Sequence, residues 1–356
     1  MELDNSKIMD IVKRYKKEDI TIATLCSHSS LQIFYGSKKE GFKTLGIAKK
    51  EIPKYYDAFP LAKPDKFLVV DEYKDILKYE DYLVKNNVII IPHGSVVEYI
   101  GGENFKKLNV PVFGNKNVID WEYNREKERF WLEKAGISMP KKVYDPKDIT
   151  FPVLVKLFGA KGGKGFFIAK NYEEFKEFEP RVPYTIQEYV VGTRYYIHFF
   201  WSAIDNTGYK LKKGSLQVLG MDRRDEANID EMYKLGSQEY LRKLNITPTF
   251  VVTGNAPVVL RESLLPTIFD YGERCIDASI DLFGGLIGPF CLETIVTDKL
   301  EIKVFEISTR IVAGTNLYIS GSPYSDMIEE NLSTGRRIAI EIKRAINENK
   351  LNEILT

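Results

Sequence analysis

Short β-rich runs alternate with helical stretches through the first 120 residues of the chain. The runs are residues 20–26, 44–48, 67–70, 88–91 and 112–113. Short apolar strands separated by helical segments are typical of a parallel sheet with crossover helices, so residues 1–120 predict an α/β domain. The loops that follow the carboxyl ends of such strands line a ligand crevice. Two of these loops contain a histidine, His28 and His93.

Composition excludes several classes of protein. With 44% apolar and 28% charged residues, the 356-residue chain fits a soluble globular protein of roughly two or three domains. Its 51 basic residues balance its 50 acidic ones, so we expect no nucleic-acid partner. The apolar runs are too short to cross a bilayer, and the charged N-terminus lacks a signal-peptide pattern, so we expect no membrane association. Three scattered cysteines fit a reducing compartment and a cytoplasmic location.

Beyond residue 120 the pattern changes. Residues 121–135 predict one charged amphipathic helix ended by Gly136, and we place a domain boundary there. The chain then becomes rich in strands, which predicts a small domain over 121–190 and a mixed-sheet domain over 191–356. The larger domain is expected to contain strands at 194–201, 215–221 and 250–253, helices at 264–282 and 335–347, and a late hairpin.

A glycine-rich loop lies between two strand-like runs at residues 153–170. Its four glycines allow several backbone N–H groups to face one anion, and Lys161 and Lys164 add positive charge. The pattern GxxxxGK[ST] is absent, and the strand-like FFIA that follows offers no helix N-terminus. The loop therefore favours a flexible hairpin over a polyphosphate, with Lys156 within reach of a phosphate. A plain surface hairpin is the alternative.

The late hairpin, residues 290–310, carries two glutamates. An even turn between its strands places Glu293 opposite Glu306 on one face, and Ser308 and Arg310 follow on that face. Two close carboxylates repel each other unless a cation lies between them. The pair therefore predicts a site for Mg²⁺ or Mn²⁺, with the Arg310 guanidinium available to a phosphoryl group.

The alternative is that both glutamates face solvent on an exposed sheet. Alternation along the strand puts the apolar residues Ile302 and Val304 on the face of Glu306. We therefore expect this face to be at least partly buried.

Three features occur in the order typical of the ATP-grasp superfamily. They are a glycine–lysine hairpin, a QEYVV strand end at 187–191 and a Glu…Glu-x-Ser-x-Arg hairpin. Within it, the chain resembles the 5-formaminoimidazole-4-carboxamide ribonucleotide synthetases, which are formate-dependent ligases of purine and IMP biosynthesis. The resemblance covers nearly the whole chain. The motifs that carry it are SHSS at 27–30, PHGS at 92–95, FGN at 113–115, VVTGNAPVVLRESLL at 251–265, GPFCLE at 288–293 and FEISTRIVAGTN at 305–316.

The resemblance implies an architecture and a reaction. The expected architecture is ATP-grasp, mixed α/β, with a Rossmann-like N-terminal domain, a small glycine-flap domain and a C-terminal mixed sheet. The expected reaction converts ATP, formate and 5-aminoimidazole-4-carboxamide ribonucleotide (AICAR) into the formamido product (FAICAR), ADP and phosphate. Because formate is a poor acylating agent, it would first be activated as formyl phosphate, and catalysis would consist mainly of positioning and charge neutralisation.

The resemblance also implies roles for individual residues. Arg310 and Lys156 are expected to be catalytic, and Glu293 and Glu306 to bind the metal. The residues expected to bind the ribonucleotide are His28, Ser29, Ser95, Asn255, Thr315 and Asn316. Those expected to bind ATP are Lys156, Lys161, Gly162, Gly163, Glu188, Tyr189, Val190 and Glu226. Backbone groups of 188–190 would form the adenine hinge.

Two alternatives stay open, because the segment after Arg223 differs from the usual sequence of the family. One is an ATP-grasp ligase with a changed acid or amine substrate. The other is a paralogue that binds purine nucleotides without turnover. Retention of both glutamates and Arg310 disfavours the second alternative. The resemblance also suggests a homo-oligomer.

Overall fold

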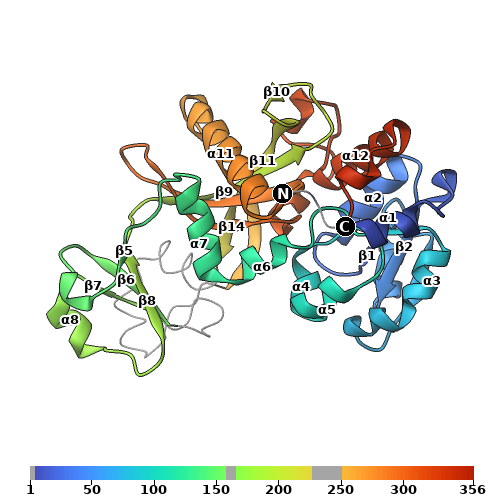
Figure 1. Ribbon diagram of the computed structural model, residues 1–356. Coiled ribbons are helices and arrows are strands. Elements are labelled where there is room, and N and C mark those ends of the chain that lie inside the picture. Colours follow the sequence, from blue (N-terminus) through green and yellow to red (C-terminus); the bar gives the residue numbers. More distant parts are fainter. Residues whose placement is uncertain (1–4, 158–165, 227–250) are drawn as a thin grey trace.

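Three β-sheets organise the chain (Figure 1). The computed structural model describes residues 5–157, 166–226 and 251–356. In the view of Figure 1 the parallel N-terminal sheet lies on the right, the largest sheet in the centre and the smallest sheet at the lower left.

The N-terminal sheet is parallel, with strand order β3-β2-β1-β4, as the alternation of strands and helices predicts. Its last apolar run adds only an isolated parallel bridge between Ile90 and Val112. The strands are β1 (Thr21–Leu25), β2 (Lys43–Ala48), β3 (Lys66–Val69) and β4 (Val88–Ile90). The helices of this part are α1 (Ser6–Val12), α2 (Ser30–Lys39), α3 (Glu80–Lys85), α4 (Gly94–Ile100) and α5 (Gly102–Lys107).

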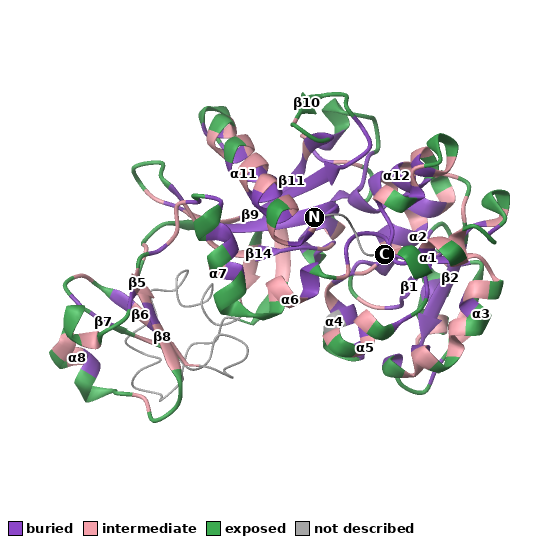
Figure 2. Cartoon of the chain, viewed as in Figure 1, coloured by how far each residue is buried: buried purple, intermediate pink, exposed green. Residues whose placement is uncertain are grey.

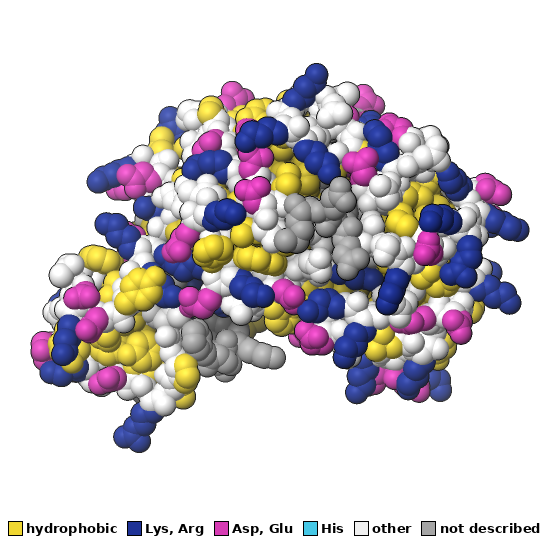
Figure 3. Space-filling view, viewed as in Figure 1, with side chains coloured by type: hydrophobic (Ala, Val, Ile, Leu, Met, Phe, Trp, Pro, Cys, Tyr) yellow, Lys and Arg dark blue, Asp and Glu magenta, His cyan; other side chains and the backbone are white. Residues whose placement is uncertain are grey.

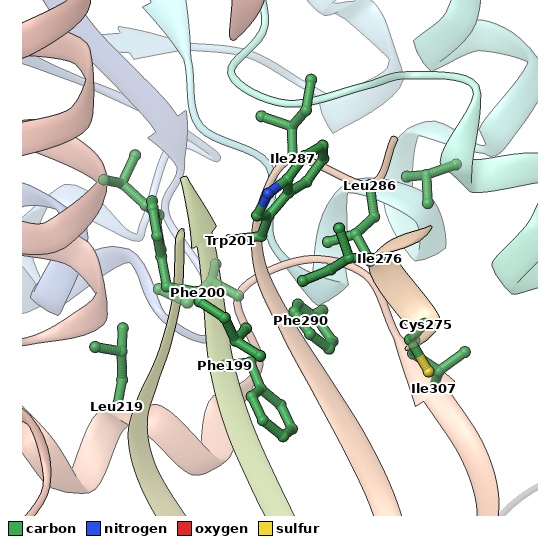
Figure 4. Close-up of a cluster of buried hydrophobic side chains, with 14 of the residues drawn as sticks. Phe199, Phe200, Trp201, Leu219, Cys275, Ile276, Leu286, Ile287, Phe290 and Ile307 are labelled. Carbon is green, nitrogen blue, oxygen red and sulfur yellow. The ribbon is translucent and has the colours of Figure 1, made fainter. Parts of the chain in front are cut away.

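The central sheet is antiparallel, with order β10-β11-β9-β13-β14 and β12 paired to β11. Its core contains Phe199, Trp201 and Phe290, which pack against Cys275 and Ile276 of α11 (Figure 4). The buried residues gather along this sheet (Figure 2). The strands are β9 (Thr193–Ser202), β10 (Tyr209–Lys210), β11 (Ser215–Glu226), β12 (Val252–Pro257), β13 (Gly288–Val296) and β14 (Ile302–Ser308), and the helices are α11 (Leu265–Phe283) and α12 (Thr334–Glu348).

The smallest sheet has order β5-β8-β6-β7 and a core of its own. Val153, Val155 and Ile186 pack there against Phe175 of the adjoining helix. Antiparallel pairing of β6 with β7 confirms that the glycine-rich segment connects two strands of one hairpin. The elements are β5 (Lys142–Val143), β6 (Val153–Leu157), β7 (Phe166–Ala169), α8 (Tyr172–Glu177) and β8 (Tyr184–Glu188).

The expectation of one helix over residues 121–135 is wrong. The chain forms α6 (Val118–Tyr123) and then α7 (Arg125–Lys134), with Asn124 between them in an extended conformation. The Asn124 side chain accepts hydrogen bonds from the N–H groups of Glu126 and Lys127, which caps the second helix. This change of direction places the end of α6 and the start of α7 beside the end of β14, as described below.

Two glycines allow α2 of the N-terminal part to cross α12 at very short distance. A Cβ atom on Gly335 would lie 2.4 Å from the carbonyl oxygen of Gln32, and one on Gly36 would lie 2.3 Å from the amide nitrogen of Arg336. The buried Gln32 side chain also accepts a hydrogen bond from the Gly335 N–H at 3.1 Å. The crossing holds the end of β1 against the C-terminal half of the chain.

On the face shown in Figure 3, lysine and arginine side chains are interspersed with aspartate and glutamate. Among the described residues, the helices lack the combination of length and apolar character that a bilayer crossing requires.

Replacing Gly335 by alanine tests the helix crossing. The added methyl group must displace backbone of α2, so we expect Gly335→Ala to lower the free energy of unfolding by about 1–3 kcal/mol. Urea denaturation measures the change. Asn347→Ala, on an exposed position of α12, is the matched control and should lie close to the wild type. Equal stability of the two variants would contradict the crossing.

Candidate active site

The two hairpin glutamates face each other across β13 and β14. Glu293 pairs with Glu306, and Cys291 pairs with Ser308, in the register that the sequence predicts. The Ser308 hydroxyl donates a hydrogen bond to Glu293 Oε1 at 3.3 Å. The side chains of Glu293 and Ser308 are buried, whereas that of Glu306 is 31% exposed. Two carboxylates and a hydroxyl therefore gather on one face of the central sheet.

The expectation that Ile302 and Val304 share this face is wrong. The register shifts after the Glu293–Glu306 pair, because Thr294 pairs with Val304 and leaves Phe305 as an extra residue. Such a β-bulge reverses the alternation of side chains along the strand. Ile302 and Val304 consequently pack in the main core, while Phe305 lies with Cys291 and Tyr196 on the glutamate side.

Each glutamate is paired with an arginine from another element. Arg224 of β11 donates to both oxygens of Glu293, at 3.0 and 3.4 Å, and its guanidinium lies 3.5 Å from the centre of the Tyr196 ring. Arg125, the first residue of α7, lies 2.9 Å from Glu306 Oε1 and 3.0 Å from Glu128 Oε2.

Burial and like charge dominate the electrostatics of this face. Loss of solvent, followed by repulsion from Glu306, raises the pKa of Glu293 to about 6 despite the opposing effect of Arg224. The same two causes raise the pKa of Glu128, whose carboxylate accepts the Ile307 N–H at 2.7 Å. Burial lowers the pKa of Lys156 on β6, and the charge of Glu306 acts in the opposite direction. Lys156 therefore lies within electrostatic range of Glu306.

Arg310 follows β14 and is held by Glu122 of α6. Glu122 Oε1 accepts from Arg310 Nη2 at 2.8 Å, and Oε2 accepts from the Thr309 N–H and hydroxyl at 3.0 and 2.6 Å. The Arg310 Nε atom is buried and has no hydrogen-bond partner among the described residues. Arg310 also lines a cavity of about 30 Å³ together with His93. The cavity brings the end of β14 next to the loop after β4.

The loops after β1 and β4 meet, as expected for neighbouring parallel strands. The Ser95 hydroxyl lies 3.0 Å from that of Ser27, and the His28 and His93 rings are 6.5 Å apart between centroids. His93 Nε2 donates to the Leu25 carbonyl, and Nδ1 accepts the Ser95 N–H. Burial lowers the pKa of His93 to about 4, so this ring is a neutral structural link.

Thr315 and Asn316 reach the same loops through Gln32. The Gln32 amide nitrogen donates to Thr315 Oγ1 at 2.6 Å and to Asn316 Oδ1 at 2.8 Å, and the Asn316 amide donates to the His28 carbonyl at 3.5 Å. Ser29 precedes the first turn of α2, and its hydroxyl is buried without a partner among the described residues.

Asn255 of β12 is oriented by a buried carboxylate. Its amide nitrogen donates to Asp222 Oδ2 at 2.6 Å, and His198 Nε2 lies 2.6 Å from the other oxygen. A Cβ atom on Gly314 would lie 2.3 Å from Asp222 Oδ1, so only glycine fits at position 314 against this carboxylate. Asn255 is thereby fixed beside the segment that reaches α2.

Two backbone N–H groups of the predicted adenine hinge already donate hydrogen bonds within the protein. The Glu188 N–H donates to the Lys141 carbonyl at 2.7 Å, and the Tyr189 N–H donates to the Pro152 carbonyl at 2.9 Å. Within the described residues, the Val190 N–H makes no backbone hydrogen bond. Glu226, at the end of β11, pairs with Arg194 at 3.1 Å. The loop residues Lys161, Gly162 and Gly163 lie outside the described residues.

The donor set on the sheet face suits a hard divalent cation. Carboxylate and hydroxyl oxygens are ligands that Mg²⁺ accepts, and the repulsion between Glu293 and Glu306 is relieved by a cation between them. In the described parts of the chain, three or more His, Cys, Asp or Glu side chains do not gather as a metal cluster. The residues therefore fit a metal that takes its other ligands from a bound molecule.

Sequence reasoning missed the residues that hold this site together. Glu122 and Arg125 lay in a stretch interpreted as one charged amphipathic helix, Asp222 was noted only as part of a family-like segment, and Gln32 carried no motif. The Asn124 cap was a usable signal for the break between the helices. Contacts with residues about 180 positions away, such as that of Glu122 with Thr309, had no signal.

Two family models match the chain. The "Protein of unknown function (DUF1246)" model matches residues 22–143, and the "Domain of unknown function (DUF1297)" model matches residues 179–356. The second match contains β9 to β14 and α12, and hence both glutamates and Arg310.

Proteins similar to this chain over nearly its full length share one name. The 5-formaminoimidazole-4-carboxamide-1-(beta)-D-ribofuranosyl 5'-monophosphate synthetase of Methanosarcina acetivorans is 61% identical over 99% of this chain and 100% of that protein. The chain belongs to this synthetase family. The synthetase of that name from Korarchaeum cryptofilum is 44% identical, again over 99% of this chain and 100% of that protein.

Solved structures agree with the synthetase family and identify the fold as ATP-grasp. The IMP biosynthesis protein PurP from Thermococcus kodakaraensis matches with a TM-score of 0.72 and 32% identity, over 94% of this chain and 100% of that chain. The ADP complex of an N5-carboxyaminoimidazole ribonucleotide synthetase matches with a TM-score of 0.62 and 14% identity, over 90% of this chain and 75% of that chain. The second likeness concerns the fold alone.

The raised pKa of Glu293 predicts a pH-dependent stability. The folded state holds the Glu293 proton more tightly than the unfolded state, so this stabilisation is complete below about pH 4.5 and is lost as the pH rises through about 6. At pH 8, Glu293→Gln should raise the free energy of unfolding by on the order of 1–2 kcal/mol, and near pH 4.5 it should not. Urea titrations in EDTA at both pH values measure this. A variant less stable than wild type at pH 8 would contradict the assignment.

Proposed function

We propose that this chain catalyses the ATP- and formate-dependent formylation of AICAR to FAICAR in IMP biosynthesis. The observation that carries the proposal is the opposed pair Glu293–Glu306 on one sheet face, with Arg310 next along the chain. Membership of the synthetase family supports the substrate, and the ATP-grasp fold supports the nucleotide.

The reaction proceeds in two transfers. A formate oxygen attacks the γ-phosphorus of ATP, ADP leaves, and formyl phosphate forms. The exocyclic amine of AICAR then attacks the formyl carbon, phosphate leaves, and the amine loses a proton. Acyl phosphates hydrolyse in water, so the site must exclude solvent between the two steps.

Charge neutralisation is the main task of the hairpin residues. Glu293 and Glu306 would hold Mg²⁺ or Mn²⁺, which would supply Lewis-acid neutralisation of phosphate charge. The Arg310 guanidinium, fixed by Glu122, faces the transferred phosphoryl group with its Nε–H, which has no partner among the described residues, and Lys156 adds charge from the small sheet. Positioning by these groups replaces covalent catalysis.

The adenine nucleotide binds between the small sheet and the central sheet. Lys161, Gly162 and Gly163 cover the triphosphate, and Glu226 contacts the ribose. Residues 188–190 contact adenine, for which the Val190 N–H is the available donor within the hinge. Two hinge N–H groups are already used, so the carbonyls of Glu188 and Tyr189 carry the remaining contacts.

AICAR binds where the N-terminal loops meet the central sheet. His28, Ser29 and Ser95 contact the ribose phosphate, because the first turn of α2 offers N–H groups to an anion and the Ser29 hydroxyl is unpaired there. Asn255, Thr315 and Asn316 contact the base from the opposite side. Asp222 engages the Asn255 amide nitrogen, which leaves the amide oxygen as an acceptor for a substrate amine.

Homo-oligomer formation belongs to the same proposal. Large apolar side chains such as Leu61, 71% exposed, and Met327, 77% exposed, are consistent with it. Light scattering on the purified protein tests the state directly, and a monomer at micromolar concentration would rule it out.

Product analysis tests the reaction. The purified protein with Mg·ATP and AICAR should release ADP only when formate is added, with an equal amount of FAICAR. ADP release with another acid in place of formate would indicate an altered acid substrate. Tight binding of AICAR and ATP without ADP release under any acid would indicate a non-catalytic paralogue.

Glu306→Gln tests the metal assignment. Losing one carboxylate removes a ligand and half of the negative charge of the pair, so we expect kcat to fall at least about a hundredfold with the fold intact. Steady-state ADP release measures kcat, and circular dichroism checks the fold. Glu301→Gln, at the exposed turn of the same hairpin, is the control and should retain activity. Unchanged activity of Glu306→Gln would remove the metal from this position.

A further inference from the structure

Both proposed metal ligands are already neutralised by arginine side chains. Arg224 makes a two-pronged contact with Glu293, and Arg125 lies 2.9 Å from Glu306. Arg224 engages both oxygens of Glu293, and Arg125 engages Oε1 of Glu306, so a divalent cation shared by the two carboxylates would compete with these guanidinium groups. The site therefore has two internal cations in the absence of metal.

We propose that Arg125 and Arg224 act as placeholders for the metal, which keep free divalent cations off Glu306 and Glu293 until the cation arrives with the nucleotide. This inference rests on the proposed function, since it assumes that the two carboxylates bind the metal of a metal–nucleotide complex. On displacement, both guanidinium groups turn to phosphate oxygens of the same nucleotide.

Electrostatics explains why the nucleotide is needed for the exchange. A free cation that displaced the arginines would leave two guanidinium charges and a divalent charge together in a site with little solvent. A triphosphate brings negative charge and oxygen acceptors suited to guanidinium, so it provides new partners for both arginines. Loading of metal and nucleotide is therefore coupled.

The surroundings of each arginine allow this exchange. Arg125 is 60% exposed and keeps Glu128, three residues along α7, as a second partner when it leaves Glu306. The Arg224 guanidinium carbon lies 3.5 Å from the centre of the Tyr196 ring, so this contact can anchor the side chain while its hydrogen bonds change partner. Neither movement requires a change in the sheet.

Arg125 also connects the site to the small sheet. It is the first residue of α7, and the chain runs from the end of this helix into β5. The arginine therefore lies at the junction between the metal ligands and the small sheet that carries Lys156. When Arg125 exchanges its partner, nucleotide binding can therefore affect the position of the small sheet.

Manganese binding without nucleotide tests the proposal. Electron paramagnetic resonance titration of Mn²⁺ should show weak binding to the wild type, and at least tenfold tighter binding to Arg125→Gln and Arg224→Gln. Arg129→Gln, which removes an equal charge from α7 where Arg129 pairs with Glu133, is the matched control and should bind as weakly as wild type. Equal affinity of all four proteins for Mn²⁺ would overturn the placeholder role.

A stability measurement distinguishes a change in metal binding from misfolding of Arg224→Gln. Arg224→Gln leaves Glu293 without its cation, so its melting temperature should fall without metal and recover with millimolar Mg²⁺, a recovery that wild type lacks. If Arg224→Gln does not fold, the half-exposed Arg125→Gln carries the test alone. Failure of wild type to bind Mn²⁺ even with ATP would refute the metal assignment itself, whereas normal Mn·ATP binding with no gain in the variants would refute only the placeholder role.

Discussion

Repulsion between two carboxylates on neighbouring strands is the constraint around which the active site is built. Glu293 and Glu306 face each other across β13 and the edge strand β14, and burial of Glu293 limits the screening of the pair by solvent. The protein offsets the repulsion with Arg224 and Arg125, which come from β11 and α7. Elements far apart in the sequence are therefore drawn to one sheet face by charge.

The same logic explains the junction between the two halves of the chain. Glu122 holds the segment after β14 by two hydrogen bonds and an ion pair, and Gln32 links α2 to Thr315 and Asn316. Both contacts are polar and largely buried, so they fix orientation more sharply than apolar packing would. The consequence is that the loops after β1 and β4 lie beside Arg310, where the ribonucleotide and the phosphoryl group are to meet.

Much of this arrangement could be predicted from the sequence, for physical reasons. The parallel sheet follows from short apolar runs at regular spacing. The predicted pairing of Glu293 with Glu306 is correct, but it depends on the bulge: the register next to the turn, with Val296 opposite Ile302, would by itself place Glu293 opposite Phe305. The bulge at Phe305 could not be predicted, because no local pattern marks it and it turns Ile302 and Val304 into a core built from segments far apart in the sequence. The arginine and Glu122 contacts could not be predicted either, since they join segments separated by tens to hundreds of residues and no local pattern marks them.

Anomalous diffraction from crystals grown with Mn²⁺ and a non-hydrolysable ATP analogue would locate the metal. We expect an anomalous peak between the Glu293 and Glu306 carboxylates, in contact with phosphate oxygens, with both arginine side chains moved off the glutamates. A peak elsewhere in the cleft, with the two acids still bound to Arg224 and Arg125, would contradict it.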